Sequence, residues 1–137
     1  MDIKFFNTSI MKMYLYADLF KAIHYSTEKH WGHELCDDSQ DNIRKYIDEL
    51  AEQIYGYYGK PKFSDFTLNH DIYYDDSLSK IYNHIIDILI SIKKDIKDID
   101  KLSGSISLID DFIGYLNQAN YLASFDKFSS YKSSSEL

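Results

Sequence analysis

The chain has 137 residues, the size of one typical domain. Hydrophobic residues make up 45% of it and charged residues 27%, a globular composition that excludes a disordered chain. Fifteen lysines and arginines stand against 22 aspartates and glutamates, which gives a net charge of −7. This negative balance argues against broad nucleic-acid binding, because phosphate contacts need a surplus of cations.

The single cysteine, Cys36, cannot form a disulfide within the chain. No signal peptide is recognisable at the N-terminus, so we expect a reducing, cytoplasmic location. No apolar run approaches the roughly 20 residues that a membrane-spanning helix needs, so we expect no membrane segment.

Two helices are predicted in the first half of the chain. The first covers residues 9–28, and its face repeats every three or four residues, at Met13, Tyr16, Ala17, Phe20 and His24. The second covers residues 33–58, with a stripe formed by Cys36, Ile43, Ile47, Leu50, Ala51 and Ile54. Gly59 and Pro61 then predict its end.

Two further helices are predicted after an aperiodic link over residues 59–76. Ser77 is a suitable N-cap for the third helix, residues 78–102. That helix carries the clearest apolar stripe of the chain: Leu78, Ile81, Ile85, Leu89, Ile92, Ile96 and Ile99. The fourth helix covers residues 105–125, with Ile109, Phe112, Ile113, Leu116 and Ala123 facing inward. We therefore expect one bundle domain over residues 1–128 and a disordered, serine-rich tail over residues 129–137.

The lengths of the connections predict the topology. Short links join the first helix to the second and the third to the fourth, so each pair is expected to be antiparallel. The 59–76 link is long enough to run the length of a ~30 Å helix at about 3.3 Å per residue. This pattern predicts an all-α, ferritin-like four-helix bundle with one long crossover between the second and third helices.

Two groups of side chains could carry chemistry. His24, Glu28, His30 and His33 gather at the corner between the first two helices, and Asp48 and Glu52 share one face of the second helix. Imidazole with carboxylate is a ligand set suited to iron or another first-row metal. The histidines could approach the carboxylates within one subunit or across a dimer. The same side chains could instead form a buried polar network that fixes the helix pairing.

Three motifs resemble the Dps-like branch of the ferritin superfamily. That branch has His-Trp late in its first helix, where this chain has His24-Tyr25. It has His-Glu-hydrophobic at the start of the second helix, matched by His33-Glu34-Leu35, and Asp-x-x-Ala-Glu later, matched by Asp48-Glu49-Leu50-Ala51-Glu52. The resemblance covers residues 10–126, and it is closest to small phage-encoded ferritin-like proteins of unassigned function.

The resemblance implies an iron site shared across a two-fold dimer. His24 and His33 would come from one subunit, and Asp48 and Glu52 from its partner. They would bind Fe(II), which peroxide or oxygen would oxidise, and the protein would be a homo-oligomer. The chain departs from the family in a corner about three residues shorter, in the absence of a short crossover helix, and in lacking a lysine-rich N-terminal arm. The last departure and the net charge argue against DNA binding.

A self-contained di-iron site is not expected, because the fourth helix offers Asp110 and Asp111 but no histidine on its inner stripe. The main alternative is a non-catalytic helical phage accessory or host-interaction protein on a ferritin-like scaffold. Whether the chain is an enzyme of the ferroxidase type is left open by the sequence. A third hypothesis is that the chain is a DNA-coating protein.

Overall fold

The computed structural model describes the backbone of residues 1–72 and 77–136, and the side chains in these ranges up to Phe125. Over these residues it holds four α-helices and no strand: α1 (Ile3–Ser26), α2 (His30–Tyr58), α3 (Leu78–Ile96) and α4 (Ser103–Glu136). Two short 3₁₀ turns, η1 (Phe63–Asp65) and η2 (Asp100–Leu102), lie in the connections. The prediction of an all-α chain of four helices is confirmed. No helix of the described part is long and apolar enough to cross a membrane.

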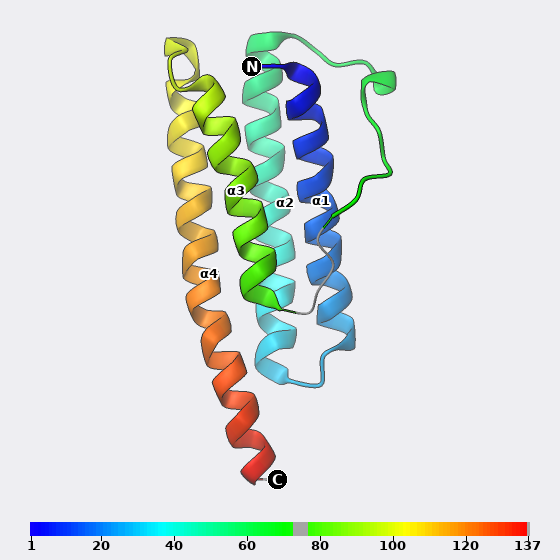
Figure 1. Ribbon diagram of the computed structural model, residues 1–137, viewed down its shortest axis with the longest axis vertical. Helices are drawn as coiled ribbons and strands as arrows, with labels where there is room; N and C mark the ends of the chain where they lie inside the picture. Colours follow the sequence, from blue (N-terminus) through cyan, green and yellow to red (C-terminus); the bar gives the residue numbers. More distant parts are fainter. Residues whose placement is uncertain (73–76, 137) are drawn as a thin grey trace.

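The helices lie side by side as a bundle (Figure 1). α1 and α2 are antiparallel neighbours, as are α3 and α4, and α2 also packs against α4. After α2 the chain turns back beside α1, so that α2 and α3 run in the same direction (Figure 1). Both ends of α2 therefore lie next to α1, and the corner between these two helices is at the opposite end of the bundle from η1.

The core is built from the apolar stripes that periodicity predicts. Five stripe residues of α3 are fully buried, and so are most of those on the other helices, although Ala51 of α2 and Ile113 of α4 are only half-buried. The largest fully buried side chains include Phe6, Met13, Phe20, Tyr82 and Phe112. Burying each large apolar side chain contributes about 1.5–3 kcal/mol, which makes this interior the main source of stability.

The helix ends differ from the predicted ones by a few residues. α1 begins at Ile3 rather than at residue 9, because the Asp2 carboxylate caps it by accepting a hydrogen bond from the Lys4 backbone N–H at 2.9 Å. α2 begins at His30 rather than at residue 33, and α3 ends at Ile96 instead of continuing to residue 102. α4 continues to Glu136, past its predicted end at residue 125, so its backbone includes all but the last residue of the predicted disordered tail, residues 129–137.

The connection after α2 contains one short element that the sequence did not predict. Gly59 ends α2 with φ of 109°, a backbone conformation that residues with a Cβ rarely adopt. The chain then forms η1, whose Asp65 carboxylate accepts a hydrogen bond from the Lys62 backbone N–H at 2.8 Å. The expectation that this connection carries no helical structure was therefore wrong, because a local side-chain bond forms this single turn.

Candidate metal centre

His24 and His33 face each other across the short corner between α1 and α2. Their rings stack with centroids 3.8 Å apart and planes 24° apart. His24 Nδ1 donates a hydrogen bond to the His33 backbone oxygen at 2.7 Å, and His33 Nδ1 donates to the His24 backbone oxygen at 2.6 Å. His24 is buried and His33 is half-buried. We call these two residues the histidine pair.

The reciprocal hydrogen bonds determine which ring nitrogen of each histidine carries the proton. A backbone carbonyl only accepts hydrogen bonds, so each Nδ1 must be the protonated nitrogen. In the neutral rings both Nε2 atoms then carry a lone pair, which is the form that binds a metal. Over the described residues His70 Nε2 is the one buried side-chain nitrogen or oxygen without a partner, so the two Nε2 atoms of the pair reach solvent.

A lysine and a carboxylate that the sequence reasoning missed lie beside the histidine pair. Lys21 Nζ and Asp37 Oδ1 form an ion pair at 2.8 Å that links α1 to α2. The hydrogen bond from Lys21 lowers the pKa of Asp37, and the nearby His24 contributes in the same direction. Spacing could have found this pair, since Lys21 lies one turn before His24 and Asp37 one turn after His33.

The predicted carboxylates, Asp48 and Glu52, lie further along α2 and are exposed. Within the described part of the chain neither forms a hydrogen bond or an ion pair. Other acidic residues of α2 are engaged, Asp37 with Lys21 and Asp41 with Lys45 at 3.0 Å. Within the described residues, Asp48 and Glu52 are thus exposed carboxylates without an ion-pair partner.

Tyr14 of α1 lies beside these carboxylates. Burial raises its pKa, and the charges of Asp48 and Glu52 add to the rise, while Arg44 opposes it. Arg44 itself is held by Asp18, with 2.6 Å between Nη2 and Oδ1. The two free carboxylates therefore occupy the outer surface of the α1–α2 layer, where a second protein molecule can reach them.

The structure does not bring the two ligand groups together in one chain. His33 and Asp48 are on the same helix, where fifteen residues span about 22 Å. Over residues 1–72 and 77–136 no three His, Cys, Asp or Glu side chains converge into a metal-binding group. The possibility that the histidines reach the carboxylates within one subunit is therefore wrong, because α2 is a continuous rigid helix between them.

The remaining corner residues have structural partners. The Trp31 indole N–H donates to the Leu122 backbone oxygen at 3.0 Å and so ties the corner to α4. His30 Nε2 lies 3.1 Å from Glu34 Oε1 at the surface, and Glu28 is exposed.

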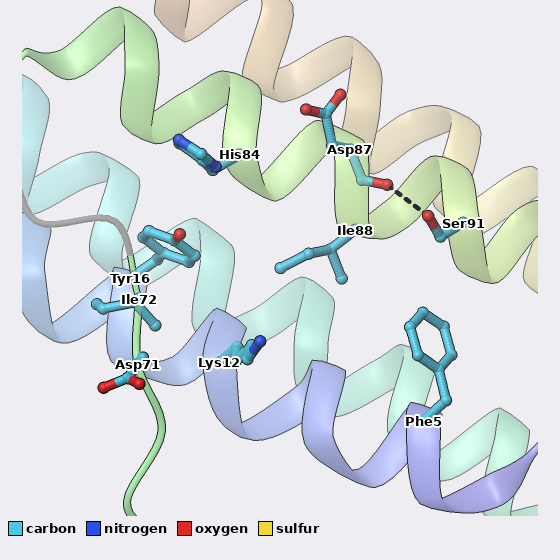
Figure 2. Close-up of a pocket in the computed structure, with 9 residues that line it drawn as sticks. All are labelled: Phe5, Lys12, Tyr16, Asp71, Ile72, His84, Asp87, Ile88 and Ser91. Atoms are coloured by element: carbon cyan, nitrogen blue, oxygen red, sulfur yellow. Dashed lines mark hydrogen bonds between the residues drawn. The ribbon is translucent and has the colours of Figure 1, made fainter.

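A separate groove lies between α1 and α3 (Figure 2). Its cavity volume is about 270 Å³, and its lining includes Lys12, Asp87 and the Tyr16 ring. That ring stacks on the half-buried His84, with centroids 6.1 Å apart. Figure 2 shows Lys12 and Asp87 on facing helices, without an ion pair between them.

Comparison of the chain with protein-family models, with curated proteins and with solved structures gave no match.

Proposed function

We propose that this chain is a Dps-like, iron-binding member of the ferritin superfamily, with a ferroxidase site formed between two copies. His24 and His33 of one subunit and Asp48 and Glu52 of the other would bind Fe(II). The observation that carries the proposal is the histidine pair, whose Nδ1 atoms are satisfied by backbone oxygens and whose Nε2 atoms remain available. Hydrogen bonds from Nδ1 to a backbone oxygen orient metal-binding imidazoles. The parallel course of α2 and α3 supports the ferritin-like topology.

The separation of the ligand groups supports a site at a dimer interface. A two-fold axis across the α1–α2 layer would make two copies of α2 antiparallel, so that the histidine end of one would face the carboxylate end of the other. The free carboxylates on this outer surface would then supply the oxygen ligands that the histidine pair lacks. Mixed nitrogen and oxygen ligation is suited to Fe(II).

In the proposed reaction iron is the substrate. Two Fe(II) ions each give one electron to hydrogen peroxide, which takes up two protons and becomes two water molecules. The chain's own residues bind and position the ions, the histidines through the Nε2 atoms that carry no proton. We place this activity in the cytoplasm, which is the host cytoplasm if the protein is phage-encoded.

The first test is anaerobic titration of the metal-free protein with Fe(II), followed by addition of peroxide or air. Iron oxidation is measured by absorbance against a protein-free control. We expect saturable binding and faster oxidation than in the control. Trp31, two residues from His33, is the single tryptophan and reports binding by a change in fluorescence. Binding no stronger than in the control would refute the proposal.

Substitution by asparagine separates the metal role of the histidine pair from its structural role. The asparagine amide N–H can replace Nδ1–H as a donor to the backbone oxygen, but it offers no equivalent of the Nε2 lone pair. We expect His24→Asn/His33→Asn to fold and to lose iron binding. The matched control is His30→Asn, since His30 is exposed and makes no bond of the pair. Full iron binding by the double variant would contradict the assignment.

The carboxylates are tested in the same way with Asp48→Asn/Glu52→Gln. These residues are exposed and unpaired, so the variant should unfold within about 0.5 kcal/mol of the parent protein. We expect iron binding to be lost, and Glu49→Gln, a neighbouring exposed charge, to leave it unchanged. Equal effects of Glu49→Gln and of the double variant would indicate a general charge effect instead of a site.

A mixing experiment tests whether the site is shared. A chain carrying His24→Asn/His33→Asn is combined with a chain carrying Asp48→Asn/Glu52→Gln. In a shared arrangement the mixed dimer has one complete site and one without ligands, so each mixed dimer should bind about half as much iron as a parent dimer, while the two kinds of unmixed dimer bind none. If native mass spectrometry shows mixed dimers but iron binding does not return, the shared site is refuted.

The alternative is a non-catalytic helical protein that keeps the histidine pair for structure alone. One observation favours it, which is that the reciprocal hydrogen bonds join α1 to α2 without any metal. Loss of stability in a histidine-to-alanine variant is consequently expected under both functions and cannot separate them. Iron binding by the asparagine variants and the carboxylate variants does separate them.

A further inference from the structure

The groove between α1 and α3 combines charged side chains with apolar walls (Figure 2). Phe5 and Lys12 line it from α1, Ile88 lines it from α3, and Ile72 lines it from the connection that leads to α3. None of the described lining residues belongs to α2, which carries three of the four proposed iron ligands. A ligand in this groove would therefore leave the candidate metal centre unoccupied.

Lys12 is the one lysine or arginine among the described lining residues of the groove. It is half-buried, and within the described part of the chain it forms no hydrogen bond or ion pair. Lys21, three turns further along the same helix, is instead held by Asp37 at 2.8 Å. The Lys12 ammonium group thus keeps its hydrogen-bond donors for an anionic group of a ligand.

Two carboxylates line the same groove. Asp71 of the connection and Asp87 of α3 are both exposed, and neither forms an ion pair with a described residue. At neutral pH the three side chains bring one positive and two negative charges to the groove. A purely anionic ligand is repelled by the carboxylates, and a purely cationic ligand leaves the Lys12 charge without a partner. A zwitterion, which carries both charges, has a partner for each of them.

Apolar side chains define the remaining part of the groove. The Phe5 ring is 37% exposed, and it points, like the Ile88 side chain, into the space between α1 and α3 (Figure 2). An apolar group that covers these side chains removes their surface from water, which favours binding. The cavity of about 270 Å³ lies below the roughly 300–1,000 Å³ of sites for drug-sized ligands. The ligand is therefore small.

We propose that this groove binds a free α-amino acid with an aromatic or branched aliphatic side chain. The carboxylate of the amino acid accepts hydrogen bonds from Lys12, and its ammonium group donates to Asp71 or Asp87. Its side chain packs against Phe5 and Ile88. A residue within a peptide chain carries neither of the two backbone charges, so the groove favours the free amino acid.

Isothermal titration calorimetry of the iron-free protein tests the two ligand charges separately. L-phenylalanine carries both charges, 3-phenylpropionate lacks the ammonium group, and 2-phenylethylamine lacks the carboxylate. We expect saturable binding of L-phenylalanine, and binding weaker by about tenfold or more for each analogue, because each loses a charge-assisted hydrogen bond. Equal binding of either analogue, or no binding of L-phenylalanine and of L-leucine, would overturn the proposal. The result is independent of the proposed iron site because no iron is present.

Lys12→Met tests the residue assigned to the carboxylate. Methionine keeps an apolar stem of similar length and removes the charge, and circular dichroism checks that the helices are retained. We expect the affinity for L-phenylalanine to fall by about tenfold or more. The matched control is Lys4→Met, because Lys4 is an exposed lysine of the same helix outside the described lining. An unchanged affinity in Lys12→Met, or an equal loss in Lys4→Met, would refute the assignment.

Asp71→Asn/Asp87→Asn tests the residues assigned to the ammonium group. This double variant should bind L-phenylalanine more weakly and 3-phenylpropionate more strongly than the parent protein, because it loses two negative charges. Misfolding would weaken the binding of both ligands, so opposite changes identify a charge-reading site. Parallel changes for the two ligands would contradict the proposal.

Discussion

Replacement of His33 by alanine is expected to weaken the corner between α1 and α2. The change removes the imidazole that donates to the His24 backbone oxygen at 2.6 Å and that stacks on the His24 ring at 3.8 Å. The His24 backbone oxygen loses its side-chain partner, while the bond from His24 Nδ1 to the backbone of residue 33 can still form. The perturbation therefore removes one half of a reciprocal arrangement.

The magnitude follows from these lost contacts. A hydrogen bond contributes about 1 kcal/mol, and an acceptor left unpaired in a half-buried corner costs about 1 kcal/mol more. Loss of the ring stacking adds about 0.5–1 kcal/mol. His33→Ala should thus lower the free energy of unfolding by about 2–3 kcal/mol, which for a chain of this length corresponds to a fall in Tm of about 6–12 °C.

His33→Asn is the matched comparison, since it keeps a donor for the His24 oxygen and should lose about 1 kcal/mol or less. Both variants are unfolded in guanidinium chloride, with circular dichroism at 222 nm and Trp31 fluorescence as separate probes of the bundle and of the corner. An alanine variant that unfolds within about 0.5 kcal/mol of the parent would mean that the reciprocal bonds contribute little. The assignment of protonated Nδ1 atoms and available Nε2 atoms, which depends on those bonds, would then fail as well.

Three further changes test other parts of the structure. Gly59→Ala should destabilise the protein by about 1–3 kcal/mol, because residue 59 has a φ of 109°. Gly56→Ala lies inside α2 with open space around its Cα and should stabilise the protein by about 0.5–1 kcal/mol. Urea denaturation measures both changes. Leu89→Ala should cost about 2–5 kcal/mol in the same assay, and a loss under 1 kcal/mol would contradict its burial in the core. Burial raises the pKa of Tyr55 to about 12, above the roughly 10 of an unfolded chain, so the unfolded state loses this proton first. The contribution of protonated Tyr55 to the free energy of unfolding is complete below pH ~10 and declines as the pH rises toward 12. Between pH 9 and pH 11 the free energy of unfolding, measured by denaturation, should therefore fall less in Tyr55→Phe than in the parent protein.

Periodicity was a reliable guide to the helices and to their buried faces. Ile85, Leu89 and Ile92 are fully buried as their spacing predicts, because a repeat near 3.6 residues leaves only one face for the core. Helix ends were predicted less well, because they depend on single local bonds. The Asp2 cap, for example, extends α1 beyond the start of its clearest apolar stripe.

The candidate metal centre was predicted in part. Position on the α1 stripe indicated that His24 is buried, and spacing placed Asp48 and Glu52 on one face of α2. The carboxylate pair is local to one helix, so the sequence alone could place it. The bonds between His24 and His33 depend on how a short corner orients two helix ends, and no spacing rule contains that orientation.

The sequence by itself determined the number of helices, the composition of the core and the candidate ligands, because these follow from patterns within single helices. Only the tertiary structure decided which side chains meet across helices, such as Lys21 with Asp37 and Tyr82 with Ser39. It also separated the histidine pair from Asp48 by about 22 Å of rigid helix. The physical reason is that a residue pattern defines the face a helix presents, while the rotation and height of its neighbour follow from the packing of the whole bundle.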